Sequence, residues 1–154
     1  MDNKILNYLE AICAKREYCI SDIRQKAYKK TEGDASLADE LVRRLTEEGF
    51  VDDLRYASAF AREKSALTGW GPVKIRFALK AKKIDSQIID SALQEIDSQR
   101  ASSKLERILE AKAGSLEGDP QKKYKLIRFA LSRGYEYSDV ESAVNRVLDG
   151  GSAR

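Results

Sequence analysis

The chain has 154 residues, 42% of them hydrophobic and 34% charged, with a formal net charge of +3. It has no histidine and only two cysteines, Cys13 and Cys19, which removes every Ser-His or Cys-His nucleophile and argues against a zinc site. Its apolar runs are far shorter than the roughly 20 residues that cross a bilayer, and its start lacks a signal peptide's apolar stretch. We therefore expect a cytoplasmic, non-enzymatic protein with no cofactor, metal or membrane contact.

A repeated segment gives the plan of the fold. The pentapeptide Ile-Arg-Phe-Ala-Leu occurs at 75–79 and at 127–131, and an Ile-Arg pair stands at 23–24. Both separations are the same, because 75 − 23 and 127 − 75 each equal 52. A fixed period of this length indicates one supersecondary unit that is repeated along the chain. Apolar residues at helical spacing and the lack of strand patterns then predict an all-α fold.

The predicted architecture is an elongated, curved array of three tandem three-helix repeats, at 1–50, 51–97 and 98–149, followed by a frayed tail at 150–154. In the first repeat, we expect one helix along the apolar residues from Ile5 to Ile12, a second that is capped by Ser21, and a third around Leu37 to Leu45. Gly49 suits the left-handed residue that ends a helix.

The second repeat opens with a helix from Asp53 to Leu67. The acidic pair Asp52-Asp53 is better explained as a helix N-terminus than as a catalytic dyad, because unpaired amides there attract carboxylates. Pro72 then starts a short helix that buries Ile75, Ala78 and Leu79, and a third helix follows Ser86.

The third repeat copies this plan after Pro120, with Ile127, Ala130 and Leu131 as its buried positions and Ile127 equivalent to Ile75. We expect a flexible loop at 113–119. The second repeat holds one more residue between Leu79 and Ala92 than the third holds between Leu131 and Ala143. The turn after the middle helix is therefore predicted to differ between the two repeats.

Basic residues gather on the middle helices and their ends, in stretches that contain no acid. Aligned by the repeat, they would form one positive surface along the array, suited to a phosphate backbone or an acidic protein groove. A lysine-rich solvated helix face is the plain alternative. The candidate partner- and DNA-binding residues are Lys74, Arg76, Lys80, Lys82, Lys83, Lys122, Lys125 and Arg128, which we call the basic set.

A longer pattern resembles a known family. It consists of the run from Gly49 to Ala57, then Phe60, Gly69, Gly71, Pro72, Ile75, Leu79, Lys82, Ile84, Ile88, Ile89, Ala92 and Leu93, and in the third repeat Lys122, Lys123, Leu126, Arg133, Gly134, Tyr135 and Val140. This is similar to the bacterial RecX family of RecA regulators. One departure is Lys83, where the family usually has glycine.

The resemblance implies three tandem three-helix repeats and a non-enzymatic modulator, in most of the family an inhibitor. Such a protein docks in the groove of the RecA filament on single-stranded DNA. We expect a monomer with weak affinity for bare single- or double-stranded DNA. Two alternatives stay open from the residues alone: a stand-alone helical DNA-binding regulator, in which the helix after Ser86 enters a major groove, and a scaffold with no polymer partner.

Overall fold

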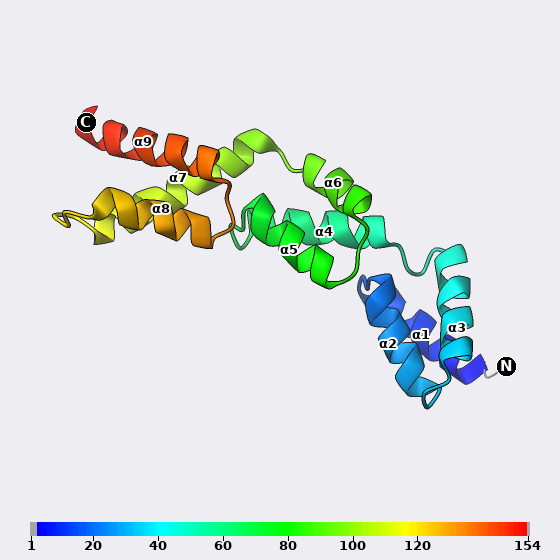
Figure 1. The fold of residues 1–154 in the computed structure, drawn as a ribbon. Helices are drawn as coiled ribbons and strands as arrows, with labels where there is room; N and C mark the ends of the chain where they lie inside the picture. The colour runs from blue at the N-terminus through cyan, green and yellow to red at the C-terminus, as the bar shows by residue number, and fades with distance from the viewer. Residues whose placement is uncertain (1–2, 154) are drawn as a thin grey trace. The chain divides into compact units, whose positions relative to one another are not determined.

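The structure is a computed structural model that describes the backbone of residues 3–153 and side chains as far as residue 150. Within this range the chain forms helices and no strand, as Figure 1 shows, so the all-α prediction is confirmed. The helices are α1 (Asn3–Lys15), α2 (Ile20–Lys30), α3 (Ala35–Glu47), α4 (Asp53–Ala66), α5 (Pro72–Ala81), α6 (Ser86–Gln94), α7 (Ser98–Ser115), α8 (Lys122–Ser132) and α9 (Tyr137–Ala153).

The chain divides into two compact units whose limits do not coincide with the predicted repeats. The first contains residues 1–59 and 79–92, and the second contains residues 60–78 and 93–154. Each of α4, α5 and α6 therefore contributes to both units. The division into repeats at 1–50, 51–97 and 98–149 and the curvature of an array stay predictions.

The first unit is built on α1, α2 and α3. Their apolar faces bury Leu9, Ile23, Leu41 and Leu45 completely. The side chain of Asp34 accepts a hydrogen bond from the backbone N–H of Leu37 and so caps the start of α3. The amphipathic pattern that predicted these helices thus also predicted their inward faces.

The second unit has its core between α7, α8 and α9, where Leu105, Leu109, Leu126 and Val140 are buried. Two boundaries differ from the sequence prediction. Residues 113–115 belong to α7 rather than to a loop, because Ala113 is buried in this core. The last helix does not stop before the predicted tail but continues to Ala153, and residue 154 lies outside the described part of the chain.

The buried positions of α8 lie one residue earlier than the repeated pentapeptide predicts. Helix α8 buries Leu126 and Ala130. Leu131 is 40% exposed, so its predicted burial was wrong, and Ile127 is only half-buried, where it packs against the edge of this core. Neighbouring residues on a helix point about 100° apart, so one position decides between core and solvent. Ile127 is therefore not the counterpart of Ile75.

The buried positions and the turns repeat with a period of 51 instead. Lys83 and Gly134 both have positive φ after the middle helix, and 134 − 83 is 51. The buried pairs Ile89 with Val140 and Ala92 with Ala143 have the same separation, 140 − 89 and 143 − 92. With this period the second repeat has no extra residue in its turn, because the sequence separation of Ala130 and Ala143 equals that of Leu79 and Ala92.

The turn after α5 keeps the glycine-type conformation without a glycine. Lys83 has φ +62°, its N–H donates to the carbonyl of Lys80, and the N–H of Ile84 donates to the carbonyl of Leu79. These two bonds are those of a Schellman cap, in which an apolar residue such as the buried Ile84 follows the left-handed position. The prediction that the turn would be built differently is therefore corrected.

Two glycines allow the start of α5 to dock closely on the turn between α8 and α9. The N–H of Gly71 donates to the carbonyl of Arg133 and the N–H of Val73 to that of Gly134, both at 2.8 Å. A β-carbon on Gly71 would lie 2.4 Å from the carbonyl oxygen of Gly134, and one on Gly134 would lie 2.2 Å from the β-carbon of Lys74. Gly71 is thus required by close approach and not by a turn conformation, which its φ does not demand.

We expect Gly71→Ala to destabilise the protein by about 1 to 3 kcal/mol, because the added methyl group meets backbone atoms that have to move. Thermal or urea unfolding measures the loss. Gly114→Ala is the matched control, since a β-carbon there meets no atom within 4 Å and Ala favours the helix. Equal unfolding curves for Gly71→Ala and wild type would contradict the close docking.

We expect Lys83→Gly to stabilise the protein by roughly 0.5 to 1 kcal/mol, because glycine adopts positive φ without steric cost. The same replacement at the exposed Lys80, inside α5, should destabilise by about 1 kcal/mol. Urea unfolding of both variants distinguishes the two positions. A loss of stability in Lys83→Gly would show that the left-handed turn is not strained by lysine.

Candidate partner-binding surface

The basic set divides between two helices and their ends. Lys80, in the last turn of α5, and Lys82 and Lys83, in the turn after it, belong to the first unit, and the other members lie in the second unit. Lys80 and Lys83 are exposed and Arg76 is half-buried. The Nζ of Lys74 lies 4.6 Å above the ring of Trp70, in a cation–π contact.

The members on α8 already have partners. Lys125 binds Asp119 at 2.6 Å, which lowers the pKa of that carboxyl group, and Lys122 lies 3.5 Å from Glu117. The guanidinium of Arg128 lies 5.6 Å from the ring centre of Tyr124. Ion pairs at the protein surface contribute little to stability, so these contacts hold the side chains only weakly.

The corrected register changes which members are equivalent. With a period of 51, Lys74 corresponds to Lys125, but Arg76 corresponds to Ile127 and Arg128 corresponds to Phe77. The sequence therefore overstated the recurrence of positive charge along the middle helices. A continuous basic surface along the array stays a prediction.

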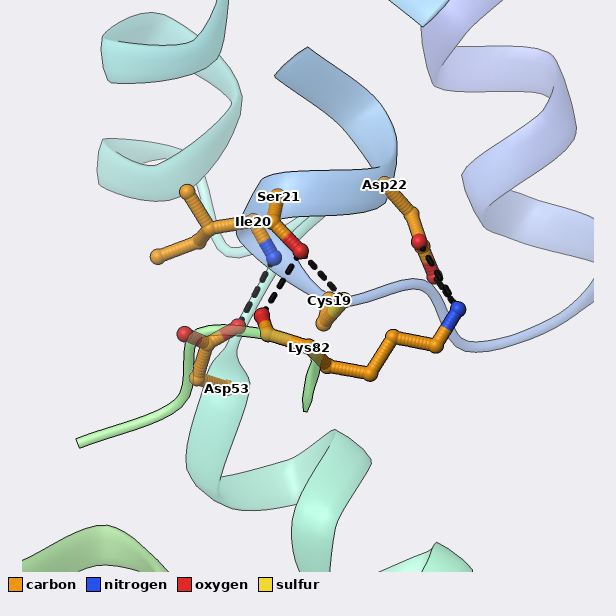
Figure 2. A network of polar contacts seen from close by, with 6 residues as sticks. All are labelled: Cys19, Ile20, Ser21, Asp22, Asp53 and Lys82. Carbon is orange, nitrogen blue, oxygen red and sulfur yellow. Dashed lines mark hydrogen bonds and ion pairs between the residues drawn. The ribbon is translucent and has the colours of Figure 1, made fainter. Parts of the chain in front are cut away.

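Lys82 belongs to a network at the start of α2, which Figure 2 shows. Its Nζ lies 3.0 Å from Oδ1 of Asp22, and its carbonyl accepts a 2.7 Å hydrogen bond from the hydroxyl of Ser21. The residue before α2, Cys19, makes no side-chain cap, and Oδ1 of Asp53 instead accepts the N–H of Ile20 at 2.7 Å. The three contacts hold the first turn of α2 against α4 and the turn that follows α5.

The electrostatics of this network agree with a structural role. The hydrogen bond to Asp22 raises the pKa of Lys82 and keeps its ammonium group charged. Burial raises the pKa of Asp53, while the N–H of Ile20 acts in the opposite direction. The sequence predicted that Asp53 stabilises the N-terminus of its own helix, α4. The structure shows that Asp52 does so, through the N–H of Arg55, whereas Asp53 caps a helix that begins 33 residues earlier.

Sequence reasoning missed two apolar side chains on the solvent face of α5. Phe77 is 77% exposed and Val73 is 49% exposed, and they stand four residues apart, so they are neighbours on one face of the helix. The signal was present in the spacing, since neither residue falls on the buried positions Ile75 and Leu79. An exposed aromatic side chain beside Lys74 and Lys80 is a typical protein-binding feature.

Among the described residues, no group of three or more His, Cys, Asp or Glu side chains is placed to hold a metal ion. No helix within the described range is long and apolar enough to cross a membrane. Cys13 and Cys19 are free thiols, and burial raises the pKa of both, which lowers their reactivity.

Comparisons with known proteins agree with this fold. Residues 52–93 match the family profile described as RecX, second three-helix domain, and residues 102–144 match RecX, third three-helix domain. Regulatory protein RecX of Pectobacterium atrosepticum is 32% identical over 96% of this chain and 99% of its own length. The chain belongs to the RecX family of regulatory proteins.

Two further relatives show how lengths vary in the RecX family. Regulatory protein RecX of Clostridium tetani is 38% identical over 68% of this chain, which spans only 49% of that protein's length. The crystal structure of RecX from Lactobacillus salivarius has a TM-score of 0.83 at 19% identity and covers 94% of this chain and 95% of its own. That likeness confirms the three-helix repeat fold, and membership of a regulatory family fits a protein that is not an enzyme.

The ion pair between Asp22 and Lys82 should be measurable by a double-mutant cycle. We expect Asp22→Asn and Lys82→Gln to show a coupling of about 0.5 kcal/mol in urea unfolding, a value kept low because the Lys82 side chain is 42% exposed. Arg43 and Glu47, a more exposed pair on α3, are the control and should couple less. Zero coupling at Lys82 would show that its charge does not hold α2.

Proposed function

We propose that this RecX-family chain is a non-enzymatic regulator of the RecA recombinase. It binds in the groove of the RecA filament on single-stranded DNA and modulates ATP hydrolysis and strand exchange, by inhibition. The observation that carries the proposal is the relationship to a regulatory protein over nearly the whole of both chains, at 32% identity. The same proposal places the chain in the cytoplasm as a monomer that binds bare DNA only weakly.

The surface of α5 supports docking on a protein partner. Phe77 and Val73 present apolar area that the described residues do not cover, and Lys80 lies one turn beyond Phe77 on the same helix. Aromatic anchors bordered by charged groups are typical of protein interfaces, where a few side chains supply most of the affinity. We therefore add Phe77 to the partner-binding residues.

A stand-alone major-groove reader is less well supported. The helix in the position of a recognition helix is α6, with the sequence Ser-Gln-Ile-Ile-Asp-Ser-Ala-Leu-Gln. It carries Asp90 and no basic residue, and Asp85 precedes it. Phosphates on both sides of a major groove would repel such a helix.

The test measures ATP hydrolysis by cognate RecA on single-stranded DNA while the protein is titrated in. We expect the wild type to lower the rate and the double variant Lys80→Glu/Lys83→Glu to lose most of this effect. Both lysines are exposed and form no ion pair with the described side chains, so the exchange should shift stability by no more than about 0.5 kcal/mol per site. Phe77→Ala should weaken the effect in the same assay.

The control is Lys15→Glu/Lys29→Glu, which reverses two exposed charges of the first repeat, to which we assign no partner contacts. Helical content and melting temperature are recorded for every variant. Full modulation by folded Lys80→Glu/Lys83→Glu would remove the end of α5 from the binding surface. No effect of the wild type on RecA would refute the proposed function itself.

A further inference from the structure

A second group of basic side chains, different from the basic set, lines a hollow of the second unit. The hollow has a volume of about 730 Å³ and is lined by the end of α4, the connection from α6 to α7, and the first half of α7. Four basic side chains line it: Arg62 from α4, and Arg100, Lys104 and Arg107 from α7. None of the four belongs to the basic set on the middle helices.

The basic and the acidic side chains of α7 lie on different faces of the helix. Arg100, Lys104 and Arg107 have the spacing of one helix face, whereas Glu106 and Glu110 line a different hollow together with Arg146. Glu106 forms an ion pair with Arg146. A helix face that is merely solvated gains stability when acids and bases alternate, so the accumulation of one sign here points to an outside partner.

The two carboxylates at the hollow, Asp97 and Glu95, already bind groups of the chain itself. Oδ1 of Asp97 accepts the N–H groups of Gln99 and Arg100, at 2.9 Å and 3.1 Å, and so caps α7. Glu95 lies 3.8 Å from Arg62. Within the described residues, Arg100, Lys104 and Arg107 have no ion-pair partner, so the hollow keeps a positive charge.

The chemistry of the lining fits phosphodiester groups. Guanidinium groups bind phosphate oxygens in pairs, and the hydroxyls of Ser65 and Ser103 in the same hollow are further hydrogen-bond donors. From Arg100 to Arg107 the helix rises roughly 10 Å, which is more than one phosphate group covers. A chain of phosphates is therefore a better match than a single anion.

We propose that this hollow is a binding site for the backbone of a single-stranded nucleic acid. A flexible strand can follow a concave surface and place its phosphates on the α7 cations. The site rests on the proposed function only in setting the chain beside DNA, and it needs no RecA to bind. An acidic protein segment is the alternative occupant.

The test is the binding of the full chain to fluorescein-labelled oligothymidylate of about 20 nucleotides, followed by anisotropy at several salt concentrations without RecA. We expect Arg100→Gln/Arg107→Gln to bind roughly tenfold more weakly at low salt and to reduce the log–log salt slope by roughly 1.4, since each single-strand phosphate contact contributes about 0.7. Lys15→Gln/Lys29→Gln removes the same charge elsewhere and should leave the slope less affected.

Unchanged affinity and slope in Arg100→Gln/Arg107→Gln would overturn the proposal, as would the absence of oligothymidylate binding by the wild type. A duplex of the same length that binds as tightly, with the same loss in the variant, would overturn the single-strand assignment. RecA inhibition is read in a separate assay, so a wild type that inhibits RecA but fails this titration refutes the site alone. One that passes this titration but leaves RecA unaffected refutes the proposed function alone.

Discussion

The structure depends on how the first turns of the middle helices α2 and α5 are held. The first N–H groups of a helix have no partner inside it, and burying them without one is costly. In the first unit, Asp53 accepts the N–H of Ile20 and the carbonyl of Lys82 accepts the hydroxyl of Ser21. In the second unit, the carbonyls of Arg133 and Gly134 accept the N–H groups of Gly71 and Val73.

The contacts at the start of α2 and those at the start of α5 hold a helix N-terminus by different groups. Lys82 and Arg133 are 51 residues apart and occupy the same place in the turn that ends a middle helix, so equivalent carbonyls are used both times. The contacts at the start of α5 rely on glycines, which let two backbones approach directly. Those at the start of α2 rely on side chains, and the ion pair of Lys82 with Asp22 adds charge to the contact.

These structural duties restrict which cations are available to a partner. Lys82 holds α2, whereas Lys80, on the helix that also exposes Phe77, and Lys83, in the turn after that helix, are exposed to solvent. Arg100, Lys104 and Arg107 form a separate positive hollow on α7. The surface proposed on α5 combines the exposed aromatic ring of Phe77 with lysines, whereas the hollow on α7 gathers cations without an aromatic side chain, so the two proposed surfaces differ in their chemistry.

The sequence by itself determined the all-α class, the three-helix plan and the family, because amphipathic spacing, helix caps and the ordered signature from Gly49 to Leu93 are local properties. It could not set the register of α8, because a pentapeptide repeated at 52 competes with buried positions that repeat at 51, and only packing decides which face turns inward. Tertiary structure alone showed that Asp53 caps a distant helix, that Gly71 is needed for close approach, and that Lys82 is held by Asp22. It also brought Arg62 of α4 to the cations of α7, since contacts between residues far apart in the chain leave no periodic trace in the sequence.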